Sequence, residues 1–275
     1  MNLIFGTAGI PARAKGQGTD EGVREVARLG LGSLELEFVR GVHMNTALAA
    51  RVKNLAEELH IVLSVHAPYW INLNAKEKSK LARSIDYILD SARVGFAAGA
   101  RDIVFHPAFY TGDDPEVVHE RVKESLFRIR ETLVAEGVDV VLRPETTGKP
   151  TQYGSLEELV RLSAELPGVL PCVDFAHLHA RSGGAMNTEK EFHEALDLIE
   201  KGLGPSALSK MHIHISGIEY TDKGEKEHLR LEDSDMNWKG VLSVLHERGV
   251  SGTVISESPV LEDDALLMKR FYEGL

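Results

Sequence analysis

The sequence predicts a (β/α)₈ barrel, a TIM barrel, formed by a single domain of residues 1–275. Eight short apolar segments recur along the chain, and stretches with a helical spacing of apolar residues separate them. The length agrees, because 275 residues is close to the usual size of one such barrel. A doubly wound open sheet is the alternative architecture, since it also alternates strands with helices.

The predicted strands are runs of apolar and β-branched residues bounded by turn residues. They cover residues 3–7, 34–39, 61–65, 103–106, 138–142, 170–175, 211–215 and 253–256. Continuous apolar runs, rather than strict alternation, are typical of strands that are buried on both faces of a parallel sheet. The longest segment without such a run, residues 216–235, is rich in charge and is predicted to be a loop.

Capping residues mark the helix ends between these strands. Asp114 followed by Pro115 is typical of a helix start, and Ser155 with Glu158 has the pattern of a capping box. Glycines stand where helices are expected to end before the next strand, at positions 30, 99, 137 and 249. No linker rich in proline or serine divides the chain, so we expect one domain.

The composition limits the function classes. With 42 acidic and 31 basic residues the formal charge is −11, which argues against a broad basic face for nucleic acid, although bound cations can create a local positive site. The one cysteine, Cys172, has no partner for an internal disulfide and suits a reducing compartment. No apolar run approaches the ~18 residues that span a bilayer. We therefore expect a cytoplasmic monomer with no membrane role.

Side chains that bind metals gather at the ends of the predicted strands. His66, His106, Glu145 and Asp174 stand at the ends of four consecutive predicted strands. The others are His177, three residues after Asp174, and His212, His214, His228 and Glu257, which lie in or after the last two strands. The carboxyl ends of parallel barrel strands share one rim, where barrel enzymes carry their active sites. A single histidine there is more readily explained as a hydrogen-bonded core or rim residue. Clustered carboxylates would repel one another, however, so the whole set predicts bound cations.

The ligand types indicate which metals to expect. Histidine nitrogen and carboxylate oxygen without thiolate favour Zn²⁺ or Mn²⁺, and more than four ligands imply more than one ion. No glycine-rich phosphate loop follows the first strand, and no G-x-S-x-G elbow is present. These patterns disfavour a nucleotide-cofactor enzyme and a serine hydrolase.

Six segments, in order and spacing, resemble the endonuclease IV family (AP endonuclease family 2), which are metal-dependent apurinic/apyrimidinic endonucleases among the xylose-isomerase-like barrels. The segments are SVHAPYWINL at 64–73, FHP at 105–107, PETTG at 144–148, VDFAH at 173–177, KMHI at 210–213 and SESP at 256–259. The resemblance spans nearly the whole chain. It implies that His66, His106 and Glu145 hold one zinc ion. A second ion would be held by Glu145 as a bridge with Asp174, His212 and Glu257, and a third would be served by His177 and His228.

The chain departs from the family at two positions. The family pattern D-x-H has an aspartate two residues before His228, where this sequence has Lys226. Lys226 could supply the charge of the third ion and act with Glu145 in catalysis, Glu225 or Glu227 could be the ligand from a shifted loop, or Lys226 could be a solvated loop residue. His214 stands where the family usually has asparagine and could adjust the ligand set.

The resemblance implies cleavage of the phosphodiester 5′ to an abasic site in double-stranded DNA by a metal-activated hydroxide, with two zinc ions and the third left open. Tyr69 and Trp70 stand where the family has a Tyr-Leu pair in a loop that enters the duplex, and Trp70 could fill the gap of a missing base. An aromatic lid over the rim is the alternative. Phosphate contacts would come from a few loop cations, Arg13, Lys15 and Arg40.

Two other functions remain open from the sequence. A metal-dependent sugar isomerase or epimerase uses the same barrel and the same ligand types, and the fold cannot separate it from an endonuclease. A DNA-damage binding protein without turnover is suggested by the lysine in place of the family aspartate. Incision of abasic DNA with and without a chelator separates the three.

Overall fold

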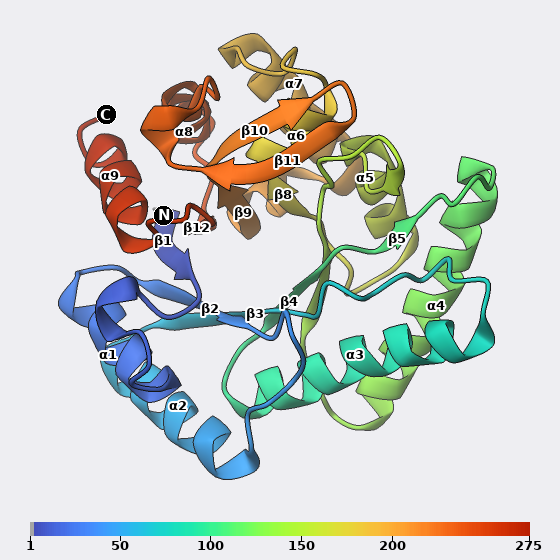
Figure 1. Ribbon diagram of the computed structural model, residues 1–275, viewed down its shortest axis with the longest axis horizontal. Helices are drawn as coiled ribbons and strands as arrows, with labels where there is room; N and C mark the ends of the chain where they lie inside the picture. Colours follow the sequence, from blue (N-terminus) through green and yellow to red (C-terminus); the bar gives the residue numbers. More distant parts are fainter. Residues whose placement is uncertain (1–2) are drawn as a thin grey trace.

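The structure, a computed structural model, describes residues 3–275, which form an eight-stranded parallel barrel surrounded by helices (Figure 1). The strand order is β6-β4-β3-β2-β1-β12-β9-β8. Backbone bridges between Leu142 and Val169 and between Glu145 and Cys172 join the β6 region to the chain around β8, so the sheet closes on itself. The predicted (β/α)₈ barrel is therefore confirmed, and the open-sheet alternative does not apply.

All eight predicted barrel strands are present, with bounds that differ by a few residues. They are β1 (Leu3–Ala8), β2 (Ser33–Glu37), β3 (Val62–His66), β4 (Asp102–Phe105), β6 (Val141–Pro144), β8 (Cys172–Asp174), β9 (Met211–Ile215) and β12 (Gly252–Ser256). The fifth begins three residues later than predicted. Its apolar run starts early because Val138 and Val140 pack into the core before the backbone joins the sheet at Val141, whose N–H donates to the Arg101 carbonyl.

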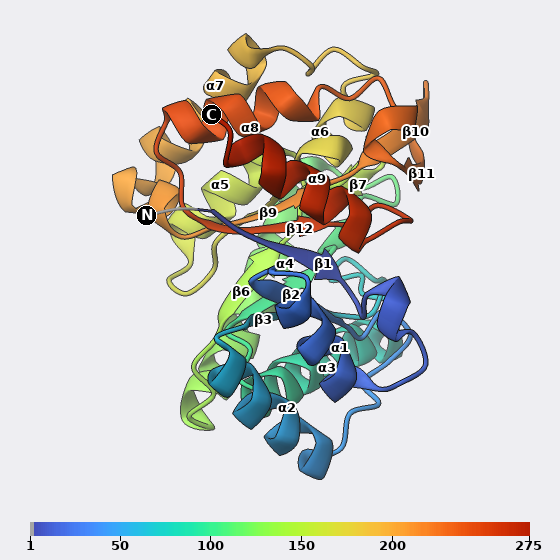
Figure 2. The same cartoon turned by 90° about the vertical axis from the view of Figure 1, so that its left-hand side faces the viewer.

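Helices cover the outside of the barrel. They are α1 (Thr19–Arg28), α2 (Thr46–Leu59), α3 (Lys78–Ala97), α4 (Pro115–Ala135), α5 (Leu156–Glu165), α6 (Phe175–Arg181), α7 (Glu189–Leu203), α8 (Trp238–Glu247) and α9 (Glu262–Tyr272), with short 3₁₀ turns at Ala12–Ala14, Pro205–Ser209 and Leu231–Asp233. Asp114 caps α4, and Ser155 with Glu158 forms the predicted capping box of α5. Figure 2 shows α1 to α3 on one side of the strands and α7 and α8 on the other. None of the helices within residues 3–275 has both the length and the apolar composition that a membrane crossing needs.

Two short antiparallel ribbons add to the barrel. One pairs β5 (Ala108–Phe109) with β7 (Gln152–Tyr153), and the other pairs β10 (Gly217–Thr221) with β11 (Gly224–Leu229). The second ribbon corrects the prediction that residues 216–235 are a loop. It forms because Ile218 and Tyr220 pack against the small residues Ala176 and Ala180 of α6, while most charged side chains of the ribbon remain in water.

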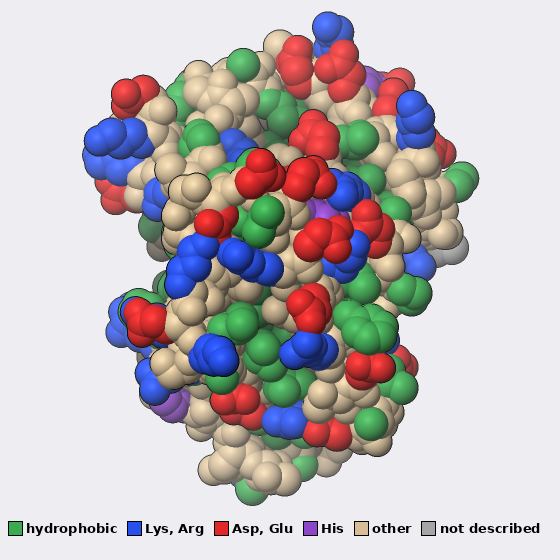
Figure 3. Space-filling view, turned by 90° about the vertical axis from the view of Figure 1, so that its right-hand side faces the viewer, with side chains coloured by type: hydrophobic (Ala, Val, Ile, Leu, Met, Phe, Trp, Pro, Cys, Tyr) green, Lys and Arg blue, Asp and Glu red, His purple; other side chains and the backbone are tan. Residues whose placement is uncertain are grey.

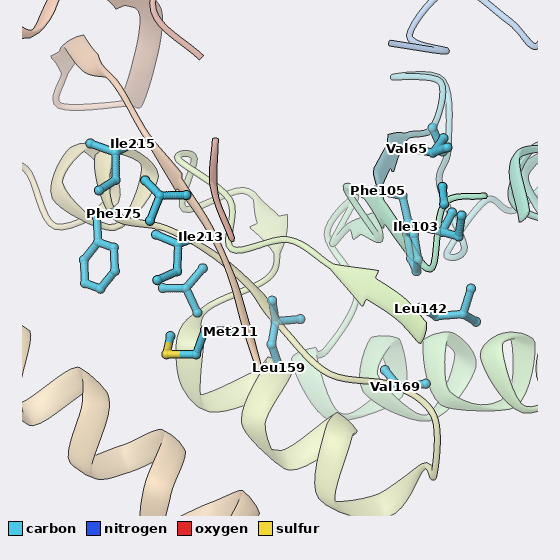
Figure 4. Close-up of a cluster of buried hydrophobic side chains, with 14 of the residues drawn as sticks. Val65, Ile103, Phe105, Leu142, Leu159, Val169, Phe175, Met211, Ile213 and Ile215 are labelled. Carbon is cyan, nitrogen blue, oxygen red and sulfur yellow. The ribbon is translucent and has the colours of Figure 1, made fainter. Parts of the chain in front are cut away.

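Side chains alternate along each barrel strand between the helices and the barrel interior. In β9, Met211, Ile213 and Ile215 belong to the apolar core, which Figure 4 shows together with apolar residues of β3, β4 and β6. The residues between them, His212 and His214, contact Glu35 of β2, a strand three places away in the sheet, so they lie inside the barrel. The interior is therefore polar where the strands end.

Candidate metal centre

The predicted ligands converge at the carboxyl ends of the strands. His66 ends β3, His106 follows β4, Glu145 follows β6, Asp174 ends β8, His214 lies in β9, Glu257 follows β12, His177 lies on α6, and Glu225 and His228 lie on β11. Figure 3 views the side on which the loops after β3 and β4 lie, and histidine is visible near its centre among acidic and basic side chains. The barrel topology thus brings together residues that are up to 191 positions apart, from His66 to Glu257.

The first group consists of His66, His106 and Glu145, whose ligand atoms all lie within 4.8 Å of one another. Oε2 of Glu145 is 3.1 Å from His66 Nε2 and 3.2 Å from His106 Nε2. His66 Nδ1 donates to the carbonyl of Ala67 at 2.8 Å, which leaves the lone pair on Nε2, inside the group. The three residues that the resemblance assigns to one ion are therefore placed to share it.

The second group consists of Glu145, Asp174, His214 and Glu257, also within 4.8 Å of one another. His214 Nδ1 lies 3.4 Å from Glu145 Oε1 and 3.3 Å from Glu257 Oε1. The two oxygens of Glu145 thus face different groups, Oε2 toward the first and Oε1 toward the second. This is the arrangement that a carboxylate needs to bridge two ions.

The geometry corrects the place given to His212 in this group. His212 Nε2 donates to Glu35 Oε2 at 2.8 Å, and Nδ1 accepts from the Thr253 hydroxyl at 2.8 Å, so both ring nitrogens are occupied one step deeper in the barrel. His214, two residues later on the same face of β9, takes its place beside Glu145. Both histidines alternate inward, so the sequence pattern alone did not show which one reaches the rim.

The third group contains His177 and His228, whose Nε2 atoms face each other at 3.2 Å. His177 Nδ1 donates to the carbonyl of Thr146 at 2.9 Å, and His228 Nδ1 donates to the carbonyl of Glu257 at 3.2 Å. In their neutral forms both rings leave a lone pair on Nε2, so either a shared proton or a metal ion lies between the two nitrogens. Two ligands of one tetrahedral zinc ion, each at ~2.0–2.1 Å, lie roughly 3.3 Å apart, which fits the observed separation.

Glu225, rather than Lys226, faces this third group. The register of the β10–β11 ribbon shifts there, with Glu219 opposite Glu227 and Tyr220 opposite Glu225, so Lys226 is the extra residue of a bulge. Glu225 Oε2 lies 3.7 Å from His177 Nε2. Gly148 permits this approach, because a Cβ there would lie 2.6 Å from the Cβ of Glu225.

Lys226 itself lies outside the ligand groups. Its ammonium is exposed and pairs with Glu219 at 2.8 Å, with Glu227 at 3.8 Å. Glu225 is not among its ion-pair partners within residues 3–275. This position corrects the expectation that Lys226 stands beside His177 and His228, and it favours the alternative of a carboxylate ligand from a shifted backbone.

Mutual charge sets the protonation of the cluster. Burial opposes ionisation of Glu145, but the charges of His106 and His214 hold its pKa well below the usual value. Burial raises the pKa of Asp174 to about 7. Burial lowers the pKa of His66, yet the hydrogen bond and charge of Glu145 outweigh it and raise that pKa to about 10. The carboxylates and the imidazoles therefore stabilise one another's charged forms.

The donor set fits divalent transition metals. Glu145 Oε1, Asp174 Oδ2 and His214 Nδ1 are buried without a hydrogen-bond partner within residues 3–275. Burying such atoms without partners costs free energy, and all three point into the second group. Nitrogen and oxygen donors in this number suit Zn²⁺ or Mn²⁺.

The residues expected to contact DNA lie around the same rim. The Tyr69 ring is tilted against that of His66, with ring centroids 5.5 Å apart, and Trp70 is 65% exposed. Both line a groove of about 730 Å³. Its wall also includes two further aromatic residues and two cations, Tyr87, Phe109, Lys80 and Arg83. Arg40 and Lys15 are exposed, while Arg13 is held near Glu262 and Asp263.

Three acidic residues of the site did not come from the family motifs. Glu35 and Glu37 lie on β2, where the pattern Leu34-Glu35-Leu36-Glu37 alternates apolar residues with acids that turn inward. This alternation was a usable signal for both. Burial raises the pKa of Glu37 to about 8, and its Oε1 is buried without a hydrogen-bond partner within the described chain. Glu225 was open as one of two carboxylates, and the bulge selects it.

Comparison with known proteins agrees with this architecture. The chain is 45% identical to an uncharacterized protein of Methanocaldococcus jannaschii over 99% of this chain and 98% of that protein. It is 29% identical to a probable endonuclease 4 of Mycoplasma pneumoniae over about half of each chain, 55% of this one and 52% of that one.

Two solved structures share the fold. Endonuclease IV from Thermus thermophilus superimposes with a TM-score of 0.72 at 20% identity, covering 95% of this chain and 97% of that one. A D-tagatose 3-epimerase-like protein gives 0.71 at 19% identity, covering 91% and 90%. Residues 23–270 match the family described as xylose isomerase-like TIM barrel, which confirms the resemblance drawn from the sequence. The chain therefore belongs to the xylose isomerase-like TIM barrel family.

Proposed function

We propose that the chain is a metal-dependent DNA-repair endonuclease that hydrolyses the phosphodiester 5′ to abasic sites in double-stranded DNA. The observation that carries the proposal is the row of three adjoining ligand groups, two of which share Glu145. A row of cations suits a polyanionic phosphodiester, whereas a sugar isomerase needs one or two ions. Zinc is the proposed metal, and Mn²⁺ is the alternative.

Each ion has a proposed set of ligands. His66, His106 and Glu145 hold the first, and Glu145 bridges to the second with Asp174, His214 and Glu257. His177, Glu225 and His228 hold the third. When bound, the ions acidify water and neutralise the charge that develops on the phosphoryl oxygens.

The residues themselves set the charge of the site. Glu145, Asp174, Glu225 and Glu257 are enough to neutralise two divalent ions but not three. The third ion therefore gives the site the positive charge that attracts phosphate in a chain whose overall charge is −11. The hydrogen bonds of His177 and His228 to backbone carbonyls hold both rings toward this third ion.

The aromatic groove beside the rim supports a nucleic-acid substrate. Trp70 and Tyr69 present exposed rings next to the ligand groups, at 65% and 54% exposure, and exposed rings are stacking surfaces for bases. Lys80 and Arg83 line the same groove and supply cations for the backbone phosphates. Arg40, which follows β2, supplies another. We propose that Trp70 occupies the gap at the abasic site.

The test is incision of a labelled duplex that contains a stable abasic analogue, with an undamaged duplex as substrate control. We expect a single cut 5′ to the analogue that a chelator abolishes and that Zn²⁺ or Mn²⁺ restores. Glu145→Gln removes the bridging carboxylate and is expected to abolish the cut. The exposed Glu227→Gln is the matched control and keeps it. Metal-loaded protein that binds abasic DNA without cutting it would refute the endonuclease proposal.

Glu37 favours a second candidate, a metal-dependent sugar epimerase. Its carboxyl lies at the end of β2, opposite His66 in the β2–β3 register, and has no role in phosphodiester hydrolysis. A carboxyl that titrates near neutral pH is suited to proton transfer. Incubation of the metal-loaded protein with ketoses in D₂O tests it. If the wild type exchanges the proton next to the carbonyl for deuterium and Glu37→Gln does not, the protein is an epimerase.

A further inference from the structure

A buried polar network lies beneath the metal centre, and it is centred on Glu35. The Glu35 side chain is fully buried. Its Oε2 accepts from the Ser64 hydroxyl at 2.7 Å and from His212 Nε2 at 2.8 Å. Its Oε1 lies 3.0 Å from His214 Nε2, a charge contact whose angles do not make a hydrogen bond within the described residues. One carboxylate thus contacts two histidines of β9 from across the barrel.

His212 supports this carboxylate and has no nitrogen left for a metal. Its Nδ1 accepts from the Thr253 hydroxyl at 2.8 Å, which fixes the proton on the Nε2 that points to Glu35. Cys172, His212 and His214 lie close enough together to suggest an interior metal site. The two hydrogen bonds of His212 argue against such a site and assign this layer to support.

We propose that Glu35 is a positioning residue for the metal centre, which holds His214 through the close charge contact at Nε2 and so directs Nδ1 toward Glu145 and Glu257. The observed contacts define the direction: Nε2 faces Glu35 at 3.0 Å, while Nδ1 faces Glu257 Oε1 at 3.3 Å. A carboxylate on the far nitrogen of a ligating histidine fixes its tautomer and strengthens it as a ligand. The inference rests on the metal centre of the proposed function but not on its DNA substrate.

The cost of burying Glu35 supports a role beyond packing. A carboxylate at this depth requires compensating groups, and the chain provides Ser64 and His212 as hydrogen-bond donors and His214 as a charge contact. An apolar residue would fill the same space at lower cost. The arrangement is therefore better explained by what Glu35 does to His214, whose Nδ1 is the ligand atom that β9 offers to the second group.

Metal affinity in the absence of DNA tests the proposal. Zinc dissociation constants are measured by competition with a chromophoric chelator for the wild type and for Glu35→Gln. The control variant is Asp102→Asn, which removes the largely buried ion pair with Arg143 elsewhere in the barrel. We expect Glu35→Gln to weaken the affected ion by roughly 10–100-fold, as loss of such a partner typically does, and to change the visible spectrum of the Co²⁺-substituted protein. Asp102→Asn changes neither.

Ser64→Ala keeps the charge of Glu35 and removes one donor, so it serves if Glu35→Gln fails to fold. It is expected to weaken zinc severalfold and to shift the Co²⁺ spectrum in the same direction. Folded variants with wild-type affinity and an unchanged Co²⁺ spectrum would overturn the proposal. Tight zinc binding that depends on Glu35 in a protein that cuts no DNA would leave this inference standing while the endonuclease proposal fails.

Discussion

The direction of each imidazole is decided by what its other nitrogen binds. In His66, His177 and His228 the Nδ1 atom donates to a backbone carbonyl, and this leaves the Nε2 lone pair toward the site. In His214 the order is reversed, with Nε2 toward Glu35. Backbone and carboxylate partners therefore orient these candidate ligands in the ion-free protein, and such orientation reduces the reorganisation that metal binding would require.

Glu225→Ala tests the third group at the level of one side chain. Loss of its carboxylate leaves His177 and His228 with Asp174 and Glu257, two carboxylates that the second ion also needs, so the third ion is expected to bind more weakly. We expect the variant to retain two ions per chain after dialysis, where wild type retains three, and to cut abasic DNA more slowly. Elemental analysis and single-turnover incision measure the two effects.

Glu227→Ala is the matched control, because Glu227 is the next acidic residue on β11 and is exposed to water. It is expected to keep wild-type metal content and rate. Three retained ions in Glu225→Ala would remove Glu225 from the ligand set.

Single residues also define how far sequence reasoning reached. His66, His106, Glu145 and Asp174 could be placed because each follows a recognisable apolar strand. The resemblance selected His212 rather than His214, whereas the structure places His214 beside Glu145, because both turn inward and differ in depth, which depends on how the strands are staggered around the barrel. Glu35 lacked a family motif, although its alternation with apolar residues marked it as facing inward.

The β10–β11 ribbon shows how one inserted residue changes a site. A bulge reverses the side-chain alternation on one side of it. The extra residue Lys226 therefore leaves Glu225 and His228 on one face, toward His177, and places its own side chain with Glu219 on the other. The sequence did not predict this ribbon, because its many charged residues outnumber the two apolar residues, Ile218 and Tyr220, that alternate along it. It did not predict β5 and β7 either, because a strand of two residues is too short to show an alternating pattern.

Deletion of Lys226 tests the bulge. The shortened strand would read Glu225-Glu227-His228, a carboxylate two residues before the histidine in regular alternation, which is the spacing of the family pattern. We expect the deletion variant to fold and to keep three ions, since the exposed Lys226–Glu219 pair contributes little to stability. Circular dichroism and metal analysis measure the result. Selective loss of the third ion would mean that the bulge is needed to aim Glu225.

The loop after β3 carries the second prediction at this scale. Trp70→Ala removes the most exposed aromatic surface of the rim, and loss of one base-stacking contact costs ~1–3 kcal/mol. We expect roughly 5–150-fold weaker binding of abasic duplex, with metal content unchanged. Fluorescence anisotropy with labelled duplex measures it. Phe127→Ala, which removes an exposed ring on α4, is the control, and equal losses in both variants would contradict a specific role for Trp70.

The barrel as a whole gathers ligands that no local segment could hold. Its core and its eight strands could be predicted because apolar runs and helix caps are local signals, whereas the assembly of candidate ligands from eight elements depends on closure of the sheet. The same closure buries the cluster and raises the pKa of several imidazoles. Burial lowers the pKa of His177 and of His214, but neighbouring groups raise both well above the usual value, chiefly Asp174 at His177 and Cys172 followed by Glu257 at His214.

Metal binding is therefore expected to release protons and to strengthen as pH rises. At neutral pH the ion-free cluster keeps His66 protonated, because its pKa is about 10, and a metal must displace that proton to reach Nε2. Asp174, with a pKa of about 7, also loses its proton more readily above neutrality. For each proton that the metal displaces, the apparent dissociation constant of the metal falls by up to about tenfold per unit rise in pH, as long as the group is protonated in the ion-free protein. Calorimetry in buffers of different ionisation enthalpy counts the protons released.

The shifted pKa of His66 also determines how the stability of the fold changes with pH. The pKa of His66 is about 10 in the folded chain and about 6.5 when unfolded, so its charged form stabilises the ion-free fold fully below pH 6.5, and this contribution is lost as pH rises toward 10. Zinc-loaded protein has exchanged that proton for an ion whose binding strengthens over the same range. The difference in melting temperature between zinc-loaded and chelator-treated protein is therefore expected to widen from about pH 6.5 to about pH 9. A difference that stays constant or narrows, with no protons released on titration with zinc, would show that the clustered histidines do not bind the metal.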